Sequence, residues 1–418
     1  MATATTELEF LVLIFALFVA PRALQRLLLP APLTCFAFGM LAALLFGLGK
    51  FSHDTTLALL ATLGISSLFL FAGLEVEFRA LRRRVAPLLG HLAVRSVALA
   101  IVTLGAMRLF ALPWQAACLL ALALLTPSTG FILETLPRLG LGEKECFWVT
   151  TKAIGGELLA LLVLFVVLQS GSVERMAWAS AALAALVALL PVLFTLLARF
   201  VLPYAPGSEF SLLLMVSMLA AYLTKELGAY YLVGAFLVGL IARLSGDRMP
   251  ALASKANVHA IKLFSSFFVP FYFFSRGVSV PQGALLWQSL WLGIGLTAAV
   301  LPFRIGIVWA QRRILVREGP RSSLRIAVAL APTLIFTLVL AGILRERFDI
   351  PDTLYGALLV YAALTTLLPS ITLSRPFDLD IDDVDAPLPG WRPAEPARSE
   401  IAQPEAVVTD RRGDGAPG

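Results

Sequence analysis

Residues 153–168 read AIGGELLALLVLFVVL, and Glu157 is the only charged residue in this stretch. A helix of about 20 mainly apolar residues is needed to cross a bilayer. Backbone groups in lipid must find their hydrogen-bond partners within the segment, so an apolar run of this kind forms a helix. The stretch therefore predicts part of a membrane-spanning helix that carries a single carboxylate.

The same apolar pattern recurs along the chain. Runs without a charged residue occur at 10–20, 33–48, 97–104, 158–168 and 285–301. Hydrophobic residues make up 59% of the 418 residues and charged residues only 14%, whereas roughly a quarter of a soluble domain is charged. That leaves too little polar surface to cover a soluble globule, and the mean hydropathy is +0.87. We predict an all-α polytopic membrane protein of about 13 transmembrane helices over residues 1–375.

Positive residues in alternate loops predict the orientation. They are Arg22 and Arg26, then Arg79, Arg82, Arg83 and Arg84, then Arg138 and Lys144, then Arg243, Arg248 and Lys255, and finally Arg312, Arg313, Arg317 and Arg321. Because Lys and Arg mark cytoplasmic loops, we expect the amino terminus outside and the carboxyl terminus in the cytoplasm. Acidic rather than basic residues precede the first apolar run, so we expect a retained helix and no cleaved signal peptide.

The composition changes after about Arg375. Aspartates cluster between 378 and 385, and Pro, Ala, Glu and Arg then recur as far as Gly418. Residues 376–418 therefore predict a disordered cytoplasmic tail. No GxGxxG motif occurs there, so we expect no nucleotide-binding domain.

Several classes of function are disfavoured. The net charge is +6, but the basic residues lie in short loops, so nucleic acid is not an expected partner. Cys35, Cys118 and Cys146 lie in or beside apolar runs without a CxxC motif, and the three histidines are scattered, so we expect no cofactor. HExxH, GxSxG and paired aspartates within spans are all missing, which argues against an enzyme.

Glu157 follows the start of its span, near Cys146, by about 11 residues, or roughly 16 Å, which places it in mid-bilayer. An ionisable residue at this depth is costly and is functional by default. Because burial favours the protonated carboxyl, Glu157 could bind a proton or a cation in turn. The alternative is a structural partner to an arginine. We expect Gly155 and Gly156 to break the helix and to admit another helix or an ion.

Two basic residues are candidate charge partners of Glu157. Arg304 lies about two turns inside its span end near Gln311, and we expect it to pair with Glu157 when no cation is bound. The alternative is that it extends to the cytoplasmic interface. Lys152, about one and a half turns before Glu157, is the rival partner. Arg95 is also deep in its span, and the sequence assigns it no role.

Two spans contain internal breaks, LTPSTG at 125–130 in the fifth and LAPT at 330–333 in the twelfth. Pro127 and Pro332 each remove a backbone donor and disrupt the helix. Paired breaks in corresponding spans indicate a transporter site near the midplane. Small hard cations prefer oxygen ligands. Beside Glu157, the candidate ligands of a transported cation are Thr126, Ser128, Thr129 and Thr333.

Three further stretches carry a family resemblance: LGISSLFLFAGLEVE at 63–77, residues 228–239 with GAFLVG at 234–239, and FFVPFYFFSRGVS at 267–279. They resemble the third, ninth and tenth spans of the bacterial monovalent cation:proton antiporters, the branch that holds sodium/proton exchangers and potassium efflux systems. The resemblance covers most of residues 8–374.

The resemblance implies 13 helices with inverted repeats, divided between a dimerisation domain and a core domain with two crossed broken helices. It places the ion-binding acid at Glu157 and the characteristic basic residue of the eleventh span at Arg304. It further implies a homodimer in the bacterial inner membrane, with an elevator-like movement of the core. Its partners would be monovalent cations, protons and the lipid bilayer.

One departure concerns the ion-binding position. The family usually has Asp there, often preceded by Asp or Asn, whereas this chain has Gly156 and Glu157. A single carboxylate, together with Arg rather than Lys in the eleventh span, favours electroneutral exchange. The leading hypothesis is a Na⁺ or K⁺/H⁺ antiporter serving pH homeostasis. Two alternatives remain open. One is a uniporter or an organic-anion or other solute carrier on the same fold, in which a basic residue facing broken-helix amino ends could hold an anion, and the other is a non-transporting membrane sensor.

Overall fold

The computed structural model describes residues 2–24, 29–45, 51, 53–76, 85–227, 231–247 and 249–373, and the part of the chain that it describes is helical, without strands. The predicted all-α fold is therefore confirmed. The helices are α1 Ala2–Leu24, α2 Ala31–Leu45, α3 Thr55–Leu74, α5 Val85–Phe110, α6 Trp114–Leu125, α7 Thr129–Thr135, α8 Glu143–Gln169, α9 Val173–Phe200, α10 Glu209–Glu226, α11 Tyr231–Leu244, α12 Lys255–Val278, α13 Trp287–Gln311, α14 Pro320–Ala329, α15 Leu334–Phe348 and α16 Asp352–Thr372.

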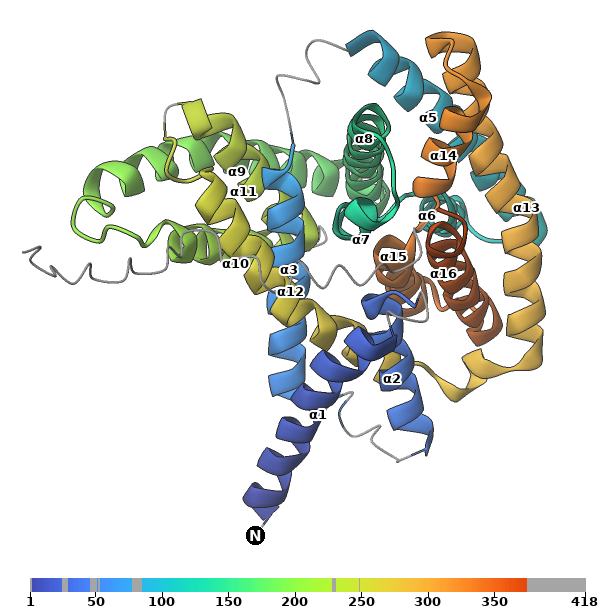
Figure 1. The fold of residues 1–418 in the computed structure, drawn as a ribbon, viewed down its shortest axis with the longest axis horizontal. Coiled ribbons are helices and arrows are strands. Elements are labelled where there is room, and N and C mark those ends of the chain that lie inside the picture. Colours follow the sequence, from blue (N-terminus) through green and yellow to red (C-terminus); the bar gives the residue numbers. More distant parts are fainter. Residues whose placement is uncertain are drawn as a thin grey trace, which may run out of the picture. The chain divides into compact units, whose positions relative to one another are not determined.

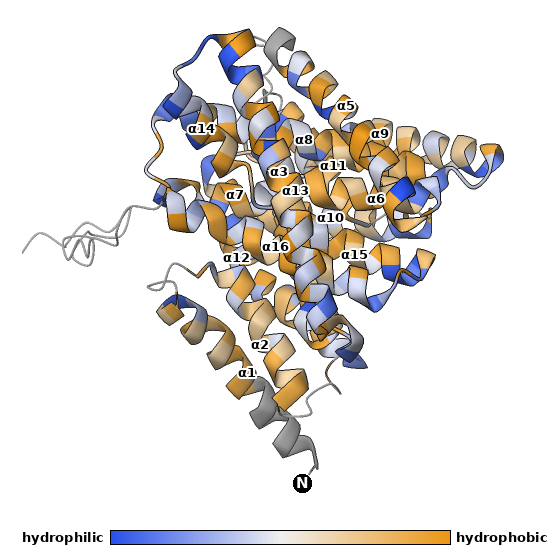
Figure 2. Ribbon diagram, turned by 90° about the vertical axis from the view of Figure 1, so that its right-hand side faces the viewer, coloured by the Kyte–Doolittle hydropathy of each residue, from blue (hydrophilic) through white to orange (hydrophobic). Residues whose placement is uncertain are grey.

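Several of these helices are long and apolar enough to cross a membrane. Within the described residues there are 8 such spans, or up to 9 if α14 and α15 form one span bent by 44°. Shorter apolar helices occur at Leu11–Leu24, Ala31–Leu45 and Tyr231–Leu244. Figure 2 shows apolar residues along the helices and hydrophilic residues mainly near helix ends and loops. The chain is thus a multi-pass membrane protein, and the count of 13 stays a prediction.

Helices α2, α3, α11 and α12 pack closely, with α12 against α2 and α3, and α11 against α3 (Figure 1). Glycines make these contacts possible. A methyl group added to Gly39 of α2 would lie 2.1 Å from the Phe274 carbonyl oxygen of α12, and one added to Gly73 of α3 would lie 2.4 Å from the Phe236 carbonyl oxygen of α11. Small residues let helix backbones approach in membranes, which explains the glycines of the stretches at 63–77 and 234–239.

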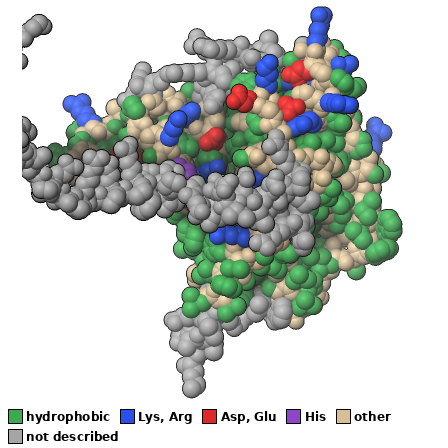
Figure 3. Space-filling view, viewed as in Figure 1, with side chains coloured by type: hydrophobic (Ala, Val, Ile, Leu, Met, Phe, Trp, Pro, Cys, Tyr) green, Lys and Arg blue, Asp and Glu red, His purple; other side chains and the backbone are tan. Residues whose placement is uncertain are grey.

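The interrupted helices lie among other helices. Helix α6 packs against α5, α8 and α15, and α16 packs against α13 and α15. The apolar window of the span Trp114–Arg138, which contains α6 and α7, is 94% buried, whereas that of α9 is 11% buried. The interrupted span of α6 and α7 therefore lies in an inner position, whereas α9 lies in an outer one. On the face shown in Figure 3, apolar side chains cover much of the surface, and Lys and Arg side chains gather mainly towards its upper part.

Some predictions concern residues outside the described part. The predicted tail, 376–418, lies there, as do the basic residues Arg26, Arg79, Arg82, Arg83, Arg84 and Arg248. The described residues belong to one unit, Met1–Arg375. The orientation of the chain in the membrane stays a prediction.

Candidate functional site

Two interrupted helices form the frame of the site. Helix α6 ends at Leu125 and α7 begins at Thr129, and the backbone between them is extended at Thr126 (φ −79°, ψ 122°). Helix α14 ends at Ala329 and α15 begins at Leu334. Each interruption contains one of the two predicted prolines. The interruptions leave backbone carbonyls and amides without partners inside their own helices.

Ser128 ties the two interruptions together. Its backbone N–H donates to the Pro332 carbonyl oxygen at 2.9 Å. Its hydroxyl oxygen accepts from the backbone N–H of Ile335 at 2.9 Å and of Phe336 at 3.3 Å. A hydroxyl in this position satisfies amides at the start of a helix. Ser128, predicted as an ion ligand, therefore caps the amino end of α15.

Arg304 lies at the carbonyl end of α14. It donates through Nη1 to the Ala331 carbonyl oxygen at 3.0 Å and to the Tyr361 hydroxyl at 2.9 Å, and through Nη2 to the Leu330 carbonyl oxygen at 3.1 Å. The Tyr361 hydroxyl in turn donates to the Leu124 carbonyl oxygen of α6 at 2.5 Å. A cation is stabilising at the carboxyl end of a helix, where the dipole is negative.

Arg95 of α5 holds the corresponding position at the other interruption. Its Nη2 donates to the carbonyl oxygen of Leu125, the last residue of α6, at 2.5 Å. Each interrupted helix thus has an arginine at the carboxyl end of its first half. The arginines come from α5, which precedes α6, and from α13, which is separated from α14 by a short π-helix, Arg312–Val316.

Glu157 is 2% exposed in the middle of α8. It interacts with the hydroxyl and the backbone amide of Thr129, at the start of α7, and electrostatically with Arg95. Even so, neither Glu157 Oε2 nor Thr129 Oγ1 has a well-formed hydrogen bond among the described residues. A buried polar atom without a partner is costly. A proton or a cation between these oxygens would remove that cost.

The predicted charge partners have other contacts. The hydrogen bonds of Arg304 go to the carbonyl end of α14 and to Tyr361. Lys152 Nζ donates to Gln311 Oε1 at 2.7 Å and lies 3.1 Å from His91 Nδ1. This structure therefore shows neither residue paired with Glu157, because carbonyl and amide oxygens already satisfy both cations. Arg95, which the sequence left without a role, lies against Gly156, the residue before Glu157, and its charge acts on the Glu157 carboxylate.

Comparison with known proteins identifies the family. Residues 12–378 match the family described as sodium/hydrogen exchanger, transmembrane. The chain belongs to the sodium/hydrogen exchanger family. Among solved structures it is similar to the sodium proton antiporter MjNhaP1 from Methanocaldococcus jannaschii at pH 8, with a TM-score of 0.67 and 13% identity over 89% of this chain and 96% of that chain. At this identity the likeness shows the fold. No curated protein matches the sequence.

In this member of the sodium/hydrogen exchanger family, the prediction of a helix break at Gly155 and Gly156 is wrong. Helix α8 runs from Glu143 to Gln169 through both residues, because glycine keeps its backbone donor and a membrane helix must satisfy its own backbone. The glycines supply space instead. An added methyl group would lie 2.9 Å from Leu88 Cδ1 at Gly155 and 2.8 Å from Arg95 Nη1 at Gly156.

The remaining predicted hydroxyls differ in what they contact. Thr126 is buried in the first interruption, and Thr333 Oγ1 lies 3.1 Å from Thr365 Oγ1. Within the described part of this exchanger-family chain, Thr129 is thus the predicted hydroxyl that lies beside Glu157. No group of three or more His, Cys, Asp or Glu side chains that could hold a metal ion occurs among the residues described. The oxygens offered to a transported cation are therefore one carboxylate, hydroxyls and carbonyls.

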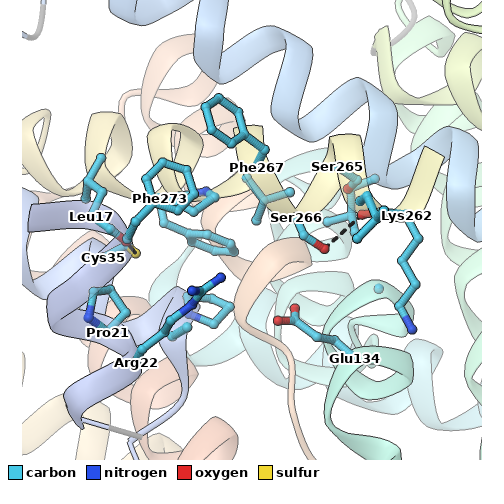
Figure 4. A pocket seen from close by; sticks show the side chains of 18 of the residues that line it. Leu17, Pro21, Arg22, Cys35, Glu134, Lys262, Ser265, Ser266, Phe267 and Phe273 are labelled. Atoms are coloured by element: carbon cyan, nitrogen blue, oxygen red, sulfur yellow. Dashed lines mark hydrogen bonds between the residues drawn. The ribbon is translucent and has the colours of Figure 1, made fainter. Parts of the chain in front are cut away.

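A cavity of about 420 Å³ lies beside α7, lined by residues of α1, α2, α3, α7 and α12. Figure 4 shows Glu134 of α7 reaching into it, with Lys262 of α12 on one side and Arg22 of α1 on the other. Gly130, which follows Thr129 in the chain, also lines the cavity. Sequence reasoning missed Glu134, because an acid near the end of a span resembles an interfacial residue.

Proposed function

We propose that this protein exchanges a monovalent cation, Na⁺ or K⁺, for protons across the membrane, with Glu157 binding proton and cation in turn. The observation that carries the proposal is the buried Glu157 carboxylate, which has an oxygen without a well-formed hydrogen bond beside Thr129. A bare carboxylate away from water is costly, so the site favours a bound proton or a bound cation. Because the two compete for the same oxygens, movement of one across the membrane requires return of the other.

The charge of the site supports electroneutral exchange. One carboxylate that holds either one proton or one monovalent cation has the same charge in both occupied states. The core then carries the same charge in both directions, so the membrane potential does not favour either direction.

The cavity beside α7 suggests how cations reach the site. Its lining carries Arg22, Arg138 and Lys262 as well as Glu134, whose carboxylate would offset part of their positive charge for an entering cation. Gly130 brings the cavity to the first turn of α7, where Thr129 faces Glu157. By the family resemblance, we place the protein in a bacterial inner membrane as a homodimer, with inverted repeats and roles in sodium or potassium transport and pH homeostasis. The amino terminus would then lie outside, and residues 376–418 would form a cytoplasmic tail.

The test is proton flux in liposomes with an imposed pH gradient, followed with a pH-sensitive dye on addition of Na⁺, K⁺, Li⁺ or choline. We expect Na⁺ or K⁺, but not choline, to collapse the gradient. Glu157→Gln should reduce this response to the level of empty liposomes while the protein elutes as wild type on size exclusion. Glu174→Gln, at the amino end of α9, is the matched control and should exchange normally. Cation-dependent flux retained in Glu157→Gln would refute the mechanism.

The anion-carrier alternative receives no support from the geometry. An anion would need free amides at the amino ends of the interrupted helices, yet the amides of Ile335 and Phe336 are bonded to Ser128. The two arginines likewise donate to backbone carbonyls. Saturable uptake of an organic anion without cation dependence would nevertheless favour it, and well-folded protein without any flux would favour the sensor.

A further inference from the structure

Arg95 occupies space that a side chain at position 156 would need. A methyl group added to Gly156 would lie 2.8 Å from Arg95 Nη1, 2.9 Å from Cζ and 3.3 Å from Nε. The whole guanidinium group therefore lies against the backbone of α8, one residue before Glu157. Ordinary contact between a carbon and a nitrogen is wider than this, so any residue larger than glycine would displace the arginine.

The same guanidinium contacts both parts of the site. Its Nη2 donates to the Leu125 carbonyl oxygen at the end of α6, and its charge acts on Glu157 of α8. A cavity of about 10 Å³ lies where the two meet, lined by Arg95, Thr126 and Gly156. Arg95 thus links the first interruption to the acid that the proposed exchange uses.

Other charged groups around the acid have different partners. Arg304, on α13, acts electrostatically on Arg95 but donates to the carbonyl end of α14. Lys152, on α8, is bonded to Gln311 and lies beside His91. From α7, Thr129 offers Glu157 a neutral hydroxyl and an amide. Arg95 is therefore the cation placed to balance the carboxylate.

We infer that Arg95 is the charge partner of Glu157 when the site holds neither cation nor proton, and that Gly156 is small because the Arg95 guanidinium lies in the space of its side chain. The inference rests on the proposed exchange at Glu157. When Na⁺ or K⁺ binds to Glu157, it replaces Arg95 as the ionic partner of the carboxylate. The hydrogen bond from Arg95 to the Leu125 carbonyl oxygen stays in place. Arg95 then sets the cation affinity of the site, since its charge opposes the binding of any other cation.

The first test compares Arg95→Gln, which removes the charge and keeps a donor, with Arg95→Lys, which keeps the charge. Coupling between two sites is typically worth 5- to 150-fold in affinity. We expect the Na⁺ concentration that half-saturates thermal stabilisation of the purified protein to fall by about fivefold or more in Arg95→Gln. It should stay near the wild-type value in Arg95→Lys. An unchanged half-saturating concentration in folded Arg95→Gln would overturn the inference.

Gly156→Ala provides a second route if Arg95→Gln does not fold. Its methyl group must displace the guanidinium. Gly155→Ala is the matched control, because its methyl group meets only the apolar side chains of Leu88, at 2.9 Å, and Leu92, at 3.7 Å. We expect Gly156→Ala to change the half-saturating Na⁺ concentration and Gly155→Ala to leave it unchanged. Equal behaviour of the two variants would contradict the role of Arg95.

A double-mutant cycle separates failure of this inference from failure of the proposed function. In choline, without Na⁺ or K⁺, Arg95→Gln should lower the midpoint of unfolding in SDS, and by less than half as much in the Glu157→Gln background. This coupling does not require transport. If the two substitutions are coupled but Na⁺ does not stabilise the protein, the ion pair is supported and cation binding at Glu157 is refuted. Equal shifts in the two backgrounds would refute the ion pair, whatever the flux.

Discussion

Replacing Arg304 by Met tests whether this arginine holds the second interruption or serves Glu157. The substitution keeps the length of the side chain and removes its donors, so Leu330, Ala331 and Tyr361 each lose a hydrogen bond. Hydrogen bonds between helices in membranes are worth about 0.6 kcal/mol on average and up to about 1.7 kcal/mol, so three of them add to roughly 2–5 kcal/mol. We expect Arg304→Met to lower the free energy of unfolding by that amount.

The matched control is Arg345→Met. Arg345 pairs with Asp352 at 3.6 Å and is partly exposed, and such pairs contribute about 0–1 kcal/mol. Unfolding by SDS in detergent micelles would measure both variants. The assay also includes Glu157→Gln and the double variant with Arg304→Met. Because Arg304 contacts carbonyls rather than Glu157, the two costs should add within about 0.5 kcal/mol.

Two results would refute this reasoning. The first is a loss of stability in Arg304→Met no larger than in Arg345→Met, which would mean that the carbonyl end of α14 does not need its cation. The second is a coupling between Arg304 and Glu157 clearly above about 0.5 kcal/mol, since residues in one network couple by roughly 0.5–3 kcal/mol. That coupling would restore the pairing predicted from the sequence and would weaken the role assigned to Arg95.

Three further predictions concern the helix packing at Gly39, the hydrogen bonds of Tyr361 between the two interruptions, and Glu134 in the cavity beside α7. Gly39→Ala should lower the free energy of unfolding by about 1–3 kcal/mol through overpacking against Phe274. Gly105→Ala, with nothing within 4 Å of the new methyl group, should raise it by up to about 1 kcal/mol through helix propensity. Thermal unfolding that ranks the two variants in the reverse order would contradict the close approach of α2 and α12. Tyr361→Phe should cost about 1–3 kcal/mol, since it leaves a buried carbonyl unpaired, and should leave the choice of cation unchanged; a changed order of preference among Na⁺, K⁺ and Li⁺ in liposomes would place the hydroxyl at the ion. Glu134→Gln should raise the half-saturating cation concentration for exchange at low ionic strength, and less at high ionic strength, without changing the maximal rate; a lost maximal rate would show that Glu134 does more than attract cations.

The sequence predicted those features that depend on local pattern. Apolar runs predicted helices because a membrane leaves the backbone no alternative. The interruptions fall where Pro127 and Pro332 stand, since proline cannot donate to the preceding turn. The predicted break at Gly155 and Gly156 failed for the converse reason, because glycine retains its donor and α8 continues through both residues.

Features that depend on which helices meet could not be predicted in this way. Arg95 and Arg304 look alike in sequence, as lone arginines within apolar spans. Only the packing of α5 against α6 and α8 places Arg95 against Gly156, the residue before Glu157. Ser128 and Thr129 are adjacent hydroxyls, yet one caps α15 and the other faces the acid. Hydroxyl oxygens suit both roles, so their assignment needs the tertiary structure.

The two arginines also explain how one acid can govern a site that contains several charges. A positive charge in the membrane needs compensation, and the carbonyl ends of α6 and α14 supply part of it through fixed hydrogen bonds. Those bonds do not involve Glu157. The interaction that does involve it is the one between Arg95 and Glu157. Movement of either occupied form then needs no rearrangement at the carbonyl ends, and only the bare site requires Arg95 as a counter-ion. A glycine before the acid is thus consistent with exchange, because the space that it leaves open contains the balancing charge.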